Sequence, residues 1–255
     1  MLTLLKAIIL GIIQGITEWL PISSSGHLVI AQQLMHLDVP ISFDILLHLG
    51  TLLVIFMVFW KDILLTLKAF FKFDFHSFYG RLSLYIIIGS VPTAVIGFTF
   101  HDLFESFFSS LFVVAIALLV TGTLLYLTKF FNGKRNLSSL DSLFIGIFQG
   151  LAIIPGISRS GSTIGLGLLL GNKKEQVAKF SFLLSIPAIL GASIFDLKDF
   201  SFTSLGTLNV IIGLITAIIV GYISLKYLLK VIMENKFYYF AYYCWILGLI
   251  ILILV

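Results

Sequence analysis

The chain has 255 residues and a mean hydropathy of +1.12; 59% of its residues are hydrophobic and only 11% are charged. Soluble domains carry roughly 25% charged residues, so the composition excludes an ordinary water-soluble globule and indicates an all-α polytopic membrane protein. We expect one integral membrane domain, residues 1–255. The net charge of +4 is not gathered in a basic stripe, which excludes nucleic acid as a partner and leaves membrane lipids.

The first predicted element is residues 2–33, an apolar stretch that proline, glycine and serine interrupt in the middle. Neither half is long enough to cross roughly 30 Å of hydrocarbon. We therefore expect a helical hairpin that enters the membrane and returns. Broken backbone at that depth must be surrounded by protein or by a water-filled cavity. A plain span over residues 2–20 is the alternative.

Six transmembrane helices follow, and a second broken apolar stretch, residues 142–171, lies between the third and the fourth. The predicted spans are residues 42–60, 82–100, 110–130, 174–195, 207–231 and 237–255. The second broken stretch has the same features as the first and is likewise expected to form a re-entrant helical hairpin.

Lysine and arginine in the loops predict the orientation of the spans, because they favour the cytoplasmic side. The expected cytoplasmic loops are 61–81, 129–135, 173–179 and 226–236, whereas the loops around Asp102 and Asp199 are acidic and are expected outside. Three spans separate the two hairpins, so the hairpins should enter from opposite sides. We predict inverted-topology repeats, about 1–135 and 136–255, whose broken segments meet near the middle of the membrane.

Both broken stretches carry one sequence motif. Residues 14–27, QGITEWLPISSSGH, align without a gap with residues 149–162, QGLAIIPGISRSGS, at an offset of 135 residues, and six positions are identical. The first copy alone holds Glu18 and His27, and the second alone holds Arg159. If the two segments meet, an acid, an imidazole, hydroxyl groups and a guanidinium converge.

Glu18 is the carboxylate that falls well inside an apolar region, which makes it a candidate functional residue. Gln14 lies four residues earlier on the same helical face. A carboxylate and an amide oxygen together can hold a hard cation, so Gln14 and Glu18 are candidate metal ligands. The alternative for Glu18 is a structural ion pair with Arg159.

Three serines and a histidine follow Pro21: Ser23, Ser24, Ser25 and His27. A serine beside an imidazole that a carboxylate orients is the arrangement that activates a hydroxyl nucleophile. We favour Ser24, because the serines on either side of it recur as Ser158 and Ser160 and so belong to the shared loop. At least one serine is expected to cap the following helix, and a satisfied interior histidine is the alternative for His27. His48, inside a predicted span, is expected only to support the site.

Residues 155–163, PGISRSGST, form a segment rich in glycine and serine that opens a helix. Backbone N–H groups at a helix start, hydroxyls and a guanidinium are suited to phosphate. An unpaired arginine in the membrane costs from about 3 to over 10 kcal/mol, so Arg159 must face Glu18 or a substrate phosphate. The candidate phosphate-binding residues are Ser23, Gly156, Ser158, Arg159, Ser160 and Thr163.

Together these motifs resemble those of the bacterial undecaprenyl-diphosphate phosphatases, the bacitracin-resistance family, and the resemblance extends over essentially the whole chain. The signatures are the Gln/Glu-x-x-x-Glu pair at Gln14 and Glu18, the Ser-Ser-x-Gly-His run at residues 23–27 and the Pro-Gly-x-Ser-Arg-Ser-x-x-Thr run at residues 155–163. Gln14 stands where many members have glutamate.

This resemblance implies hydrolysis of the C55 polyprenyl diphosphate to the monophosphate, which recycles the lipid carrier of peptidoglycan synthesis and confers bacitracin resistance. It also implies a Mg²⁺ or Ca²⁺ requirement and a site that opens to the outer face of the bacterial inner membrane. Ser24, His27 or an activated water would attack the terminal phosphorus, Glu18 would act as base or through the cation, and Arg159 would stabilise the developing charge.

Two other functions share parts of this pattern. A polyprenyl-lipid flippase without hydrolysis would also have inverted repeats and broken helices. A phosphatidate-type lipid phosphatase would share the Ser-Gly-His and Ser-Arg elements, but it requires a histidine six residues after the arginine, where this chain has Gly165.

Overall fold

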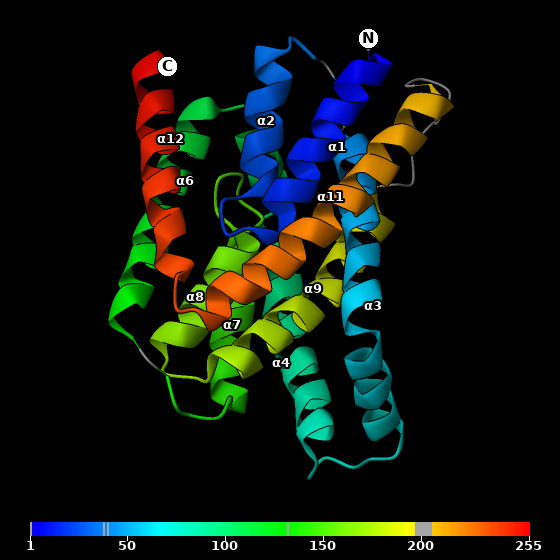
Figure 1. Ribbon diagram of the computed structural model, residues 1–255, viewed down its shortest axis with the longest axis vertical. Coiled ribbons are helices and arrows are strands. Elements are labelled where there is room, and N and C mark those ends of the chain that lie inside the picture. Colours follow the sequence, from blue (N-terminus) through cyan, green and yellow to red (C-terminus); the bar gives the residue numbers. More distant parts are fainter. Residues whose placement is uncertain (1, 38, 40, 132, 197–205) are drawn as a thin grey trace.

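The computed structural model describes residues 2–37, 39, 41–131, 133–196 and 206–255, and within these residues it is built of helices without a β-strand (Figure 1). The helices are α1 (Leu4–Trp19), α2 (Ser24–Leu34), α3 (Ile41–Phe71), α4 (Phe78–Thr99), α5 (His101–Phe107), α6 (Leu111–Leu127), η1 (Thr128–Phe130), α7 (Ser139–Leu151), α8 (Arg159–Leu169), α9 (Lys174–Asp196), α11 (Thr207–Met233), η2 (Phe237–Tyr239) and α12 (Phe240–Leu254). The predicted all-α class is confirmed.

Among the described residues, six helices are long and apolar enough to cross a membrane: α3, α4, α6 with η1, α9, α11, and η2 with α12. These are the six predicted spans, and the protein is therefore a multi-pass membrane protein. The acidic loop around Asp199, which we expected outside, lies outside the described residues.

Helix α3 is longer than predicted, because it continues past residue 60 to Phe71. The continuation buries Ile63, Thr66 and Ala69, and this spacing of three residues places them on one side of the helix. Its lysines lie on the exposed side, so charges that resemble a loop in the sequence belong to an amphipathic helix end. The helix is bent at Phe59, where φ is −110° and ψ is 17°.

Both broken segments form a helix–turn–helix, as predicted. Helices α1 and α2 have 16 and 11 residues, and α7 and α8 have 13 and 11. At about 1.5 Å per residue, the longest of them measures about 24 Å, which is short of the roughly 30 Å of a bilayer core. Each pair reaches into the protein and turns back, and the two turns lie in its interior (Figure 1).

The two halves of the chain pack reciprocally. Helix α1 of the first half packs on α11 of the second, and α7 of the second half packs on α4 of the first. Both contacts depend on glycine: an added Cβ would lie 2.8 Å from the Gly221 nitrogen at Gly15 and 2.1 Å from the Gly89 oxygen at Gly146. Such close approach through small residues is typical of membrane helices. This packing is expected of two repeats in which the first helix of each packs on a helix of the other. Entry of the two hairpins from opposite sides of the membrane stays a prediction.

Opposite entry can be tested with single cysteines in a Cys244→Ser background. Gln33 and Asn136 are both exposed. Gln33 lies near the end of α2 in the first hairpin, and Asn136 lies just before α7 in the second, both away from the hairpin turns. We expect Gln33→Cys to react with a membrane-impermeant maleimide on intact cells and Asn136→Cys to react only after permeabilisation. Labelling of both positions on intact cells, or of neither, would contradict the inverted repeat.

A candidate active site between the two hairpin turns

The two motif copies meet at their turns. The Gly156 backbone N–H donates a hydrogen bond to Ser23 Oγ at 3.0 Å, and the Ser160 hydroxyl donates to the Leu20 carbonyl at 3.4 Å. Residues more than 130 positions apart in the sequence therefore form one site, as the repeated motif predicts.

The serines that both copies share shape the turns. Ser23 caps α2 by accepting from the Gly26 N–H at 3.3 Å, and Ser158 caps α8 by accepting from the Gly161 N–H at 3.0 Å. In each copy the hydroxyl two residues further on lies 3.3 Å from the capping hydroxyl. The predicted capping role of a serine in the first motif is confirmed. The position between the two shared serines is Ser24 in one copy and Arg159 in the other.

Gly156 is required by its backbone. Its φ is +100°, and an added Cβ would lie 2.5 Å from the Val114 carbonyl oxygen. Its N–H is held by Ser23 and its carbonyl accepts from Thr121 Oγ1 at 2.9 Å. The Gly156 N–H joins the two hairpins in this arrangement, and the binding of phosphate by Gly156 stays a prediction.

Thr163, also predicted to bind phosphate, is turned toward the protein interior. Its hydroxyl donates to the Arg159 carbonyl at 2.8 Å and pairs with the Ser181 hydroxyl of α9. The hydroxyl groups of Ser158 and Ser160 are likewise engaged in the turn. In this arrangement these residues build the cradle, and Arg159 is the member of the segment that projects to its centre.

Glu18 lies at the centre of the candidate site, and its side chain is only 1% exposed. One carboxylate oxygen, Oε1, forms an ion pair with Arg159 Nη2. The other, Oε2, accepts hydrogen bonds from Ser24 Oγ at 2.6 Å and from Gln14 Nε2 at 3.0 Å. The structure thus brings together four of the predicted site residues, Gln14, Glu18, Ser24 and Arg159.

His27 lies elsewhere, and its predicted pairing with Ser24 is wrong. Its Nδ1–H donates to the Ser23 carbonyl at 2.7 Å, its Nε2 lies 2.7 Å from the Tyr243 hydroxyl, and its ring stacks on Tyr243. Both residues lie in the first turn of α2, yet the short Ser24 side chain binds Glu18 of α1, whereas the imidazole of His27 reaches Tyr243 of α12. The base nearest the Ser24 hydroxyl is Glu18.

Helix α3 contributes two further residues to the site, His48 and Thr51, of which the sequence indicated only His48, and that in a supporting role. His48 Nε2 lies 3.2 Å from Glu18 Oε2 and 3.4 Å from Ser24 Oγ, and its Nδ1–H donates to the Asp44 carbonyl at 2.7 Å. Thr51 Oγ1 accepts from Gln14 Nε2 at 3.3 Å. Their three-residue spacing on an apolar helix is a signal of a shared polar face. His48, expected only to support the site, directly contacts its centre.

Two buried polar atoms beside the ion pair, Arg159 Nη1 and Gln14 Oε1, have no hydrogen-bond partner among the described residues. Burying such atoms unpaired costs about 1–3 kcal/mol each. The guanidinium is held in place by Trp19, whose ring centroid lies 5.7 Å from Arg159 Cζ. The site therefore offers a spare donor, which suits a phosphate oxygen, and a spare acceptor, which suits a cation.

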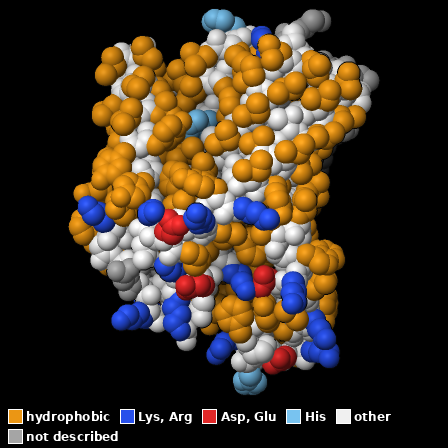
Figure 2. Space-filling model, viewed as in Figure 1, with side chains coloured by type: hydrophobic (Ala, Val, Ile, Leu, Met, Phe, Trp, Pro, Cys, Tyr) orange, Lys and Arg blue, Asp and Glu red, His pale blue; other side chains and the backbone are white. Residues whose placement is uncertain are grey.

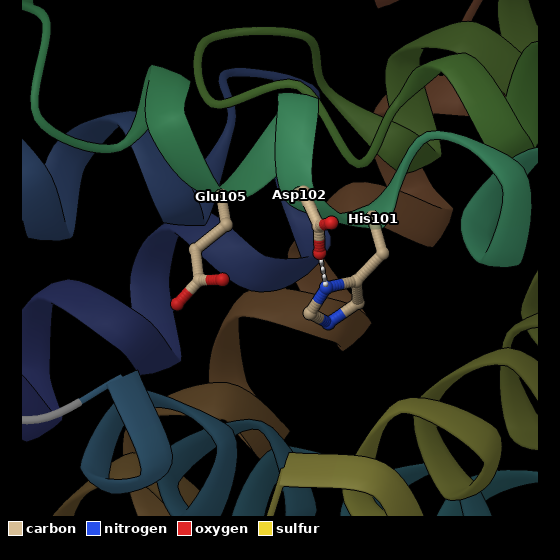
Figure 3. A group of neighbouring side chains, drawn as sticks. All are labelled: His101, Asp102 and Glu105. Atoms are coloured by element: carbon tan, nitrogen blue, oxygen red, sulfur yellow. Dashed lines mark hydrogen bonds and ion pairs between the residues drawn. The ribbon is translucent and has the colours of Figure 1, made fainter.

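The donor set fits a hard cation in part. Mg²⁺ is commonly bound by one or two carboxylates together with substrate phosphate oxygens, and Glu18 with Gln14 Oε1 supplies the protein share of such a shell. Another group of three possible ligands in the described residues, His101, Asp102 and Glu105, lies on the exposed helix α5 (Figure 3). Exposed acidic groups of this kind commonly occur in proteins without a bound ion. Helix α5 is also far in the sequence from both hairpin turns, and we do not assign this group to the candidate site.

Comparisons with known proteins agree with these motifs. A sequence model described as bacitracin resistance protein BacA matches residues 7–250. The undecaprenyl-diphosphatase of Halothermothrix orenii is 46% identical over 98% of this chain and 97% of its own length. Those of Carboxydothermus hydrogenoformans and Methanobrevibacter smithii are 45% and 44% identical, over 98% and 97% of this chain and 96% of each relative. This chain belongs to the bacitracin resistance protein BacA family.

Proposed function

We propose that this protein is an undecaprenyl-diphosphatase, which hydrolyses the C55 polyprenyl diphosphate to the monophosphate and inorganic phosphate. The observation that carries the proposal is the cluster of Glu18, Ser24 and Arg159 between the hairpin turns, in which Arg159 retains a spare donor. Full-length similarity to proteins that carry this name supports it. A flippase requires no hydroxyl bound to a buried carboxylate.

In the proposed reaction, the terminal phosphate binds to Arg159, and Ser24 Oγ attacks its phosphorus while the hydroxyl proton passes to Glu18 Oε2. The bond from phosphorus to the bridging oxygen breaks, and polyprenyl monophosphate leaves with the electron pair. Water then attacks the phosphorus of the phosphoserine, the Ser24 oxygen leaves and takes back the proton from Glu18, and inorganic phosphate is released. Arg159 stabilises the negative charge on the phosphoryl oxygens throughout. An attack by water activated by Glu18 is the alternative.

A Mg²⁺ or Ca²⁺ ion bound by Glu18 and Gln14 would supply further neutralisation of phosphate charge. His27 holds the Ser23 carbonyl and so keeps the turn in the conformation that places Ser24. We therefore assign His27 a positioning role.

The proposed location is the bacterial inner membrane, with the site open to the outer face and the polyprenyl tail left in the lipid. Hydrolysis there would return the lipid carrier to peptidoglycan synthesis and confer bacitracin resistance. The multi-pass architecture and the membership of the BacA family support a membrane location and a lipid substrate.

The test is phosphate release by the purified, detergent-solubilised protein from polyprenyl diphosphates of several chain lengths, with and without a chelator. We expect release from the C55 diphosphate, loss of release with the chelator and recovery on adding Mg²⁺ or Ca²⁺. Transport of labelled lipid across vesicles without phosphate release would favour the flippase. Full activity in the presence of the chelator would contradict the proposed requirement for a cation.

A further inference from the structure

A groove of about 560 Å³ lies between α1, α11 and α12 and is bordered by the first hairpin turn. Its walls are apolar for most of their length: Ile13, Ile16, Leu20, Ile22, Val231 and Phe240. His27 and Tyr243, which bind each other, lie at the hairpin end, and Lys236 and Tyr239 lie at the other.

The groove is separate from the phosphate site. In an α-helix successive residues are about 100° apart, so Ile13 and Ile16 lie on a different face of α1 from Gln14 and Glu18. The face with Glu18 contacts α3 and Arg159, whereas the other borders the groove. The diphosphate that Arg159 binds would therefore not lie in this groove.

The other end of the groove is strongly basic. It lies at the turn that joins α11 to η2, which holds Lys236 and one carboxylate, Glu234. Lysines from three other segments gather around the same turn. Lys174 Nζ donates to Asn235 Oδ1 at 3.1 Å, Lys129 Nζ lies 5.5 Å from the centroid of the Tyr238 ring, and Lys226 and Lys230 are on the last turns of α11.

Figure 2 shows a row of Lys and Arg side chains below a broad apolar surface. Lys236 donates to Glu234 at 2.7 Å, and this hydrogen bond raises the pKa of Lys236 above its ordinary value. Lys236 borders the groove itself, and the turn beside this end carries the other lysines and one carboxylate, so the surroundings of this end are basic at neutral pH.

We propose that the groove binds one anionic phospholipid, with an acyl chain along the apolar walls and the phosphate at the lysines around Lys236. Basic clusters between membrane helices are typical binding places for anionic lipid headgroups. The position of the charge also sets the direction of the ligand: its headgroup lies at the Lys236 end. A polyprenyl diphosphate with its headgroup at Arg159 would lie the opposite way, so the site is a lipid site additional to the substrate site.

The chain end of this lipid would contact the hairpin turn that places Ser24. Leu20, Ile22 and His27 all border the groove, and His27 also binds the Ser23 carbonyl. An occupied groove thus packs against the outer wall of the first turn. Binding should stabilise the folded protein and keep the turn ordered.

The test is the thermal unfolding temperature of the purified protein in uncharged detergent with added phosphatidylglycerol or phosphatidylcholine. We expect phosphatidylglycerol to raise the midpoint by about 3 °C or more beyond phosphatidylcholine. Ile16→Trp, which fills the groove, and Lys236→Gln, which weakens its mouth, should each abolish this difference. Ile12 is as exposed as Ile16, 38% each, but does not border the groove, so Ile12→Trp is the matched control for Ile16→Trp. Lys68 also does not border the groove, so Lys68→Gln is the control for Lys236→Gln.

Equal shifts from both lipids would show unspecific lipid around the protein and overturn the proposal. A loss of the difference in Ile12→Trp or Lys68→Gln would do the same. Native mass spectrometry provides a second readout, in which wild type retains one phosphatidylglycerol and Ile16→Trp retains none. If polyprenyl phosphate competes for this lipid and Ile16→Trp abolishes phosphate release, the groove belongs to the substrate instead. Because the readouts measure binding, the result does not depend on the proposed enzymatic activity.

Discussion

Replacing Arg159 with lysine is expected to lower phosphate release at least about a hundredfold, or about 2.7 kcal/mol of activation free energy. Lysine keeps the charge but loses the planar fork that holds two oxygens at once. Arg159 uses Nη2 for Glu18, whereas Nη1 has no partner among the described residues and is the proposed donor to phosphate. An ammonium has three donors but no planar fork, so it cannot hold the Glu18 and phosphate oxygens in the same geometry. The measurement is the steady-state rate of phosphate release by purified protein.

The control for this substitution is Arg81→Lys, which changes an exposed arginine at the start of α4. It should leave the rate unchanged. Near-normal turnover in Arg159→Lys would remove Arg159 from the site, and the unfolding temperature of each variant separates an effect on turnover from an effect on folding.

Ser24→Ala is expected to lower phosphate release at least about a thousandfold, equivalent to about 4 kcal/mol, because it removes the proposed nucleophile. Ser25→Ala is the matched control and should cost less than about tenfold, since this hydroxyl only contacts Ser23 within the turn. Rates of phosphate release by the purified variants decide between the two.

The Ser24 hydroxyl shares Glu18 with His48, so these residues should act as one unit. The double variant Ser24→Ala with His48→Ala is therefore expected to be scarcely slower than Ser24→Ala alone. Equal losses in Ser24→Ala and Ser25→Ala would contradict the assignment of the nucleophile and favour activated water.

Much of the fold is readable from the sequence, because hydrocarbon imposes a length on every span. Hydropathy placed the six spans, and the proline, glycine and serine in each motif predicted the two helical hairpins. The predicted end of the first span, residue 60, is wrong, because a count of charges does not distinguish a loop from the exposed side of a helix. The structure shows that the helix continues to Phe71 and buries Ile63, Thr66 and Ala69 on one side.

The candidate site was predictable where residues are unusual for their surroundings. Glu18 and Arg159 are costly in an apolar segment, and the repeated motif indicated that they meet; the structure pairs them. His27 was placed wrongly because its closeness to Ser24 in the sequence does not show which neighbour each side chain contacts: Ser24 binds Glu18 of α1, and His27 binds Tyr243 of α12. The direct contact of His48 depends on how α3 packs beside α1, which no local pattern encodes.

The central claim is that Glu18 takes part in the reaction and is more than the structural partner of Arg159. The most direct test compares Glu18→Gln with wild type in two measurements on one preparation, namely affinity for polyprenyl diphosphate and rate of phosphate release. Glutamine keeps the size and one of the two acceptor oxygens but cannot accept the Ser24 proton. We predict that affinity is retained while release falls about a hundredfold, in the range of lost general-base catalysis. A parallel loss of affinity, release and thermal stability, or release at the wild-type rate, would contradict the account.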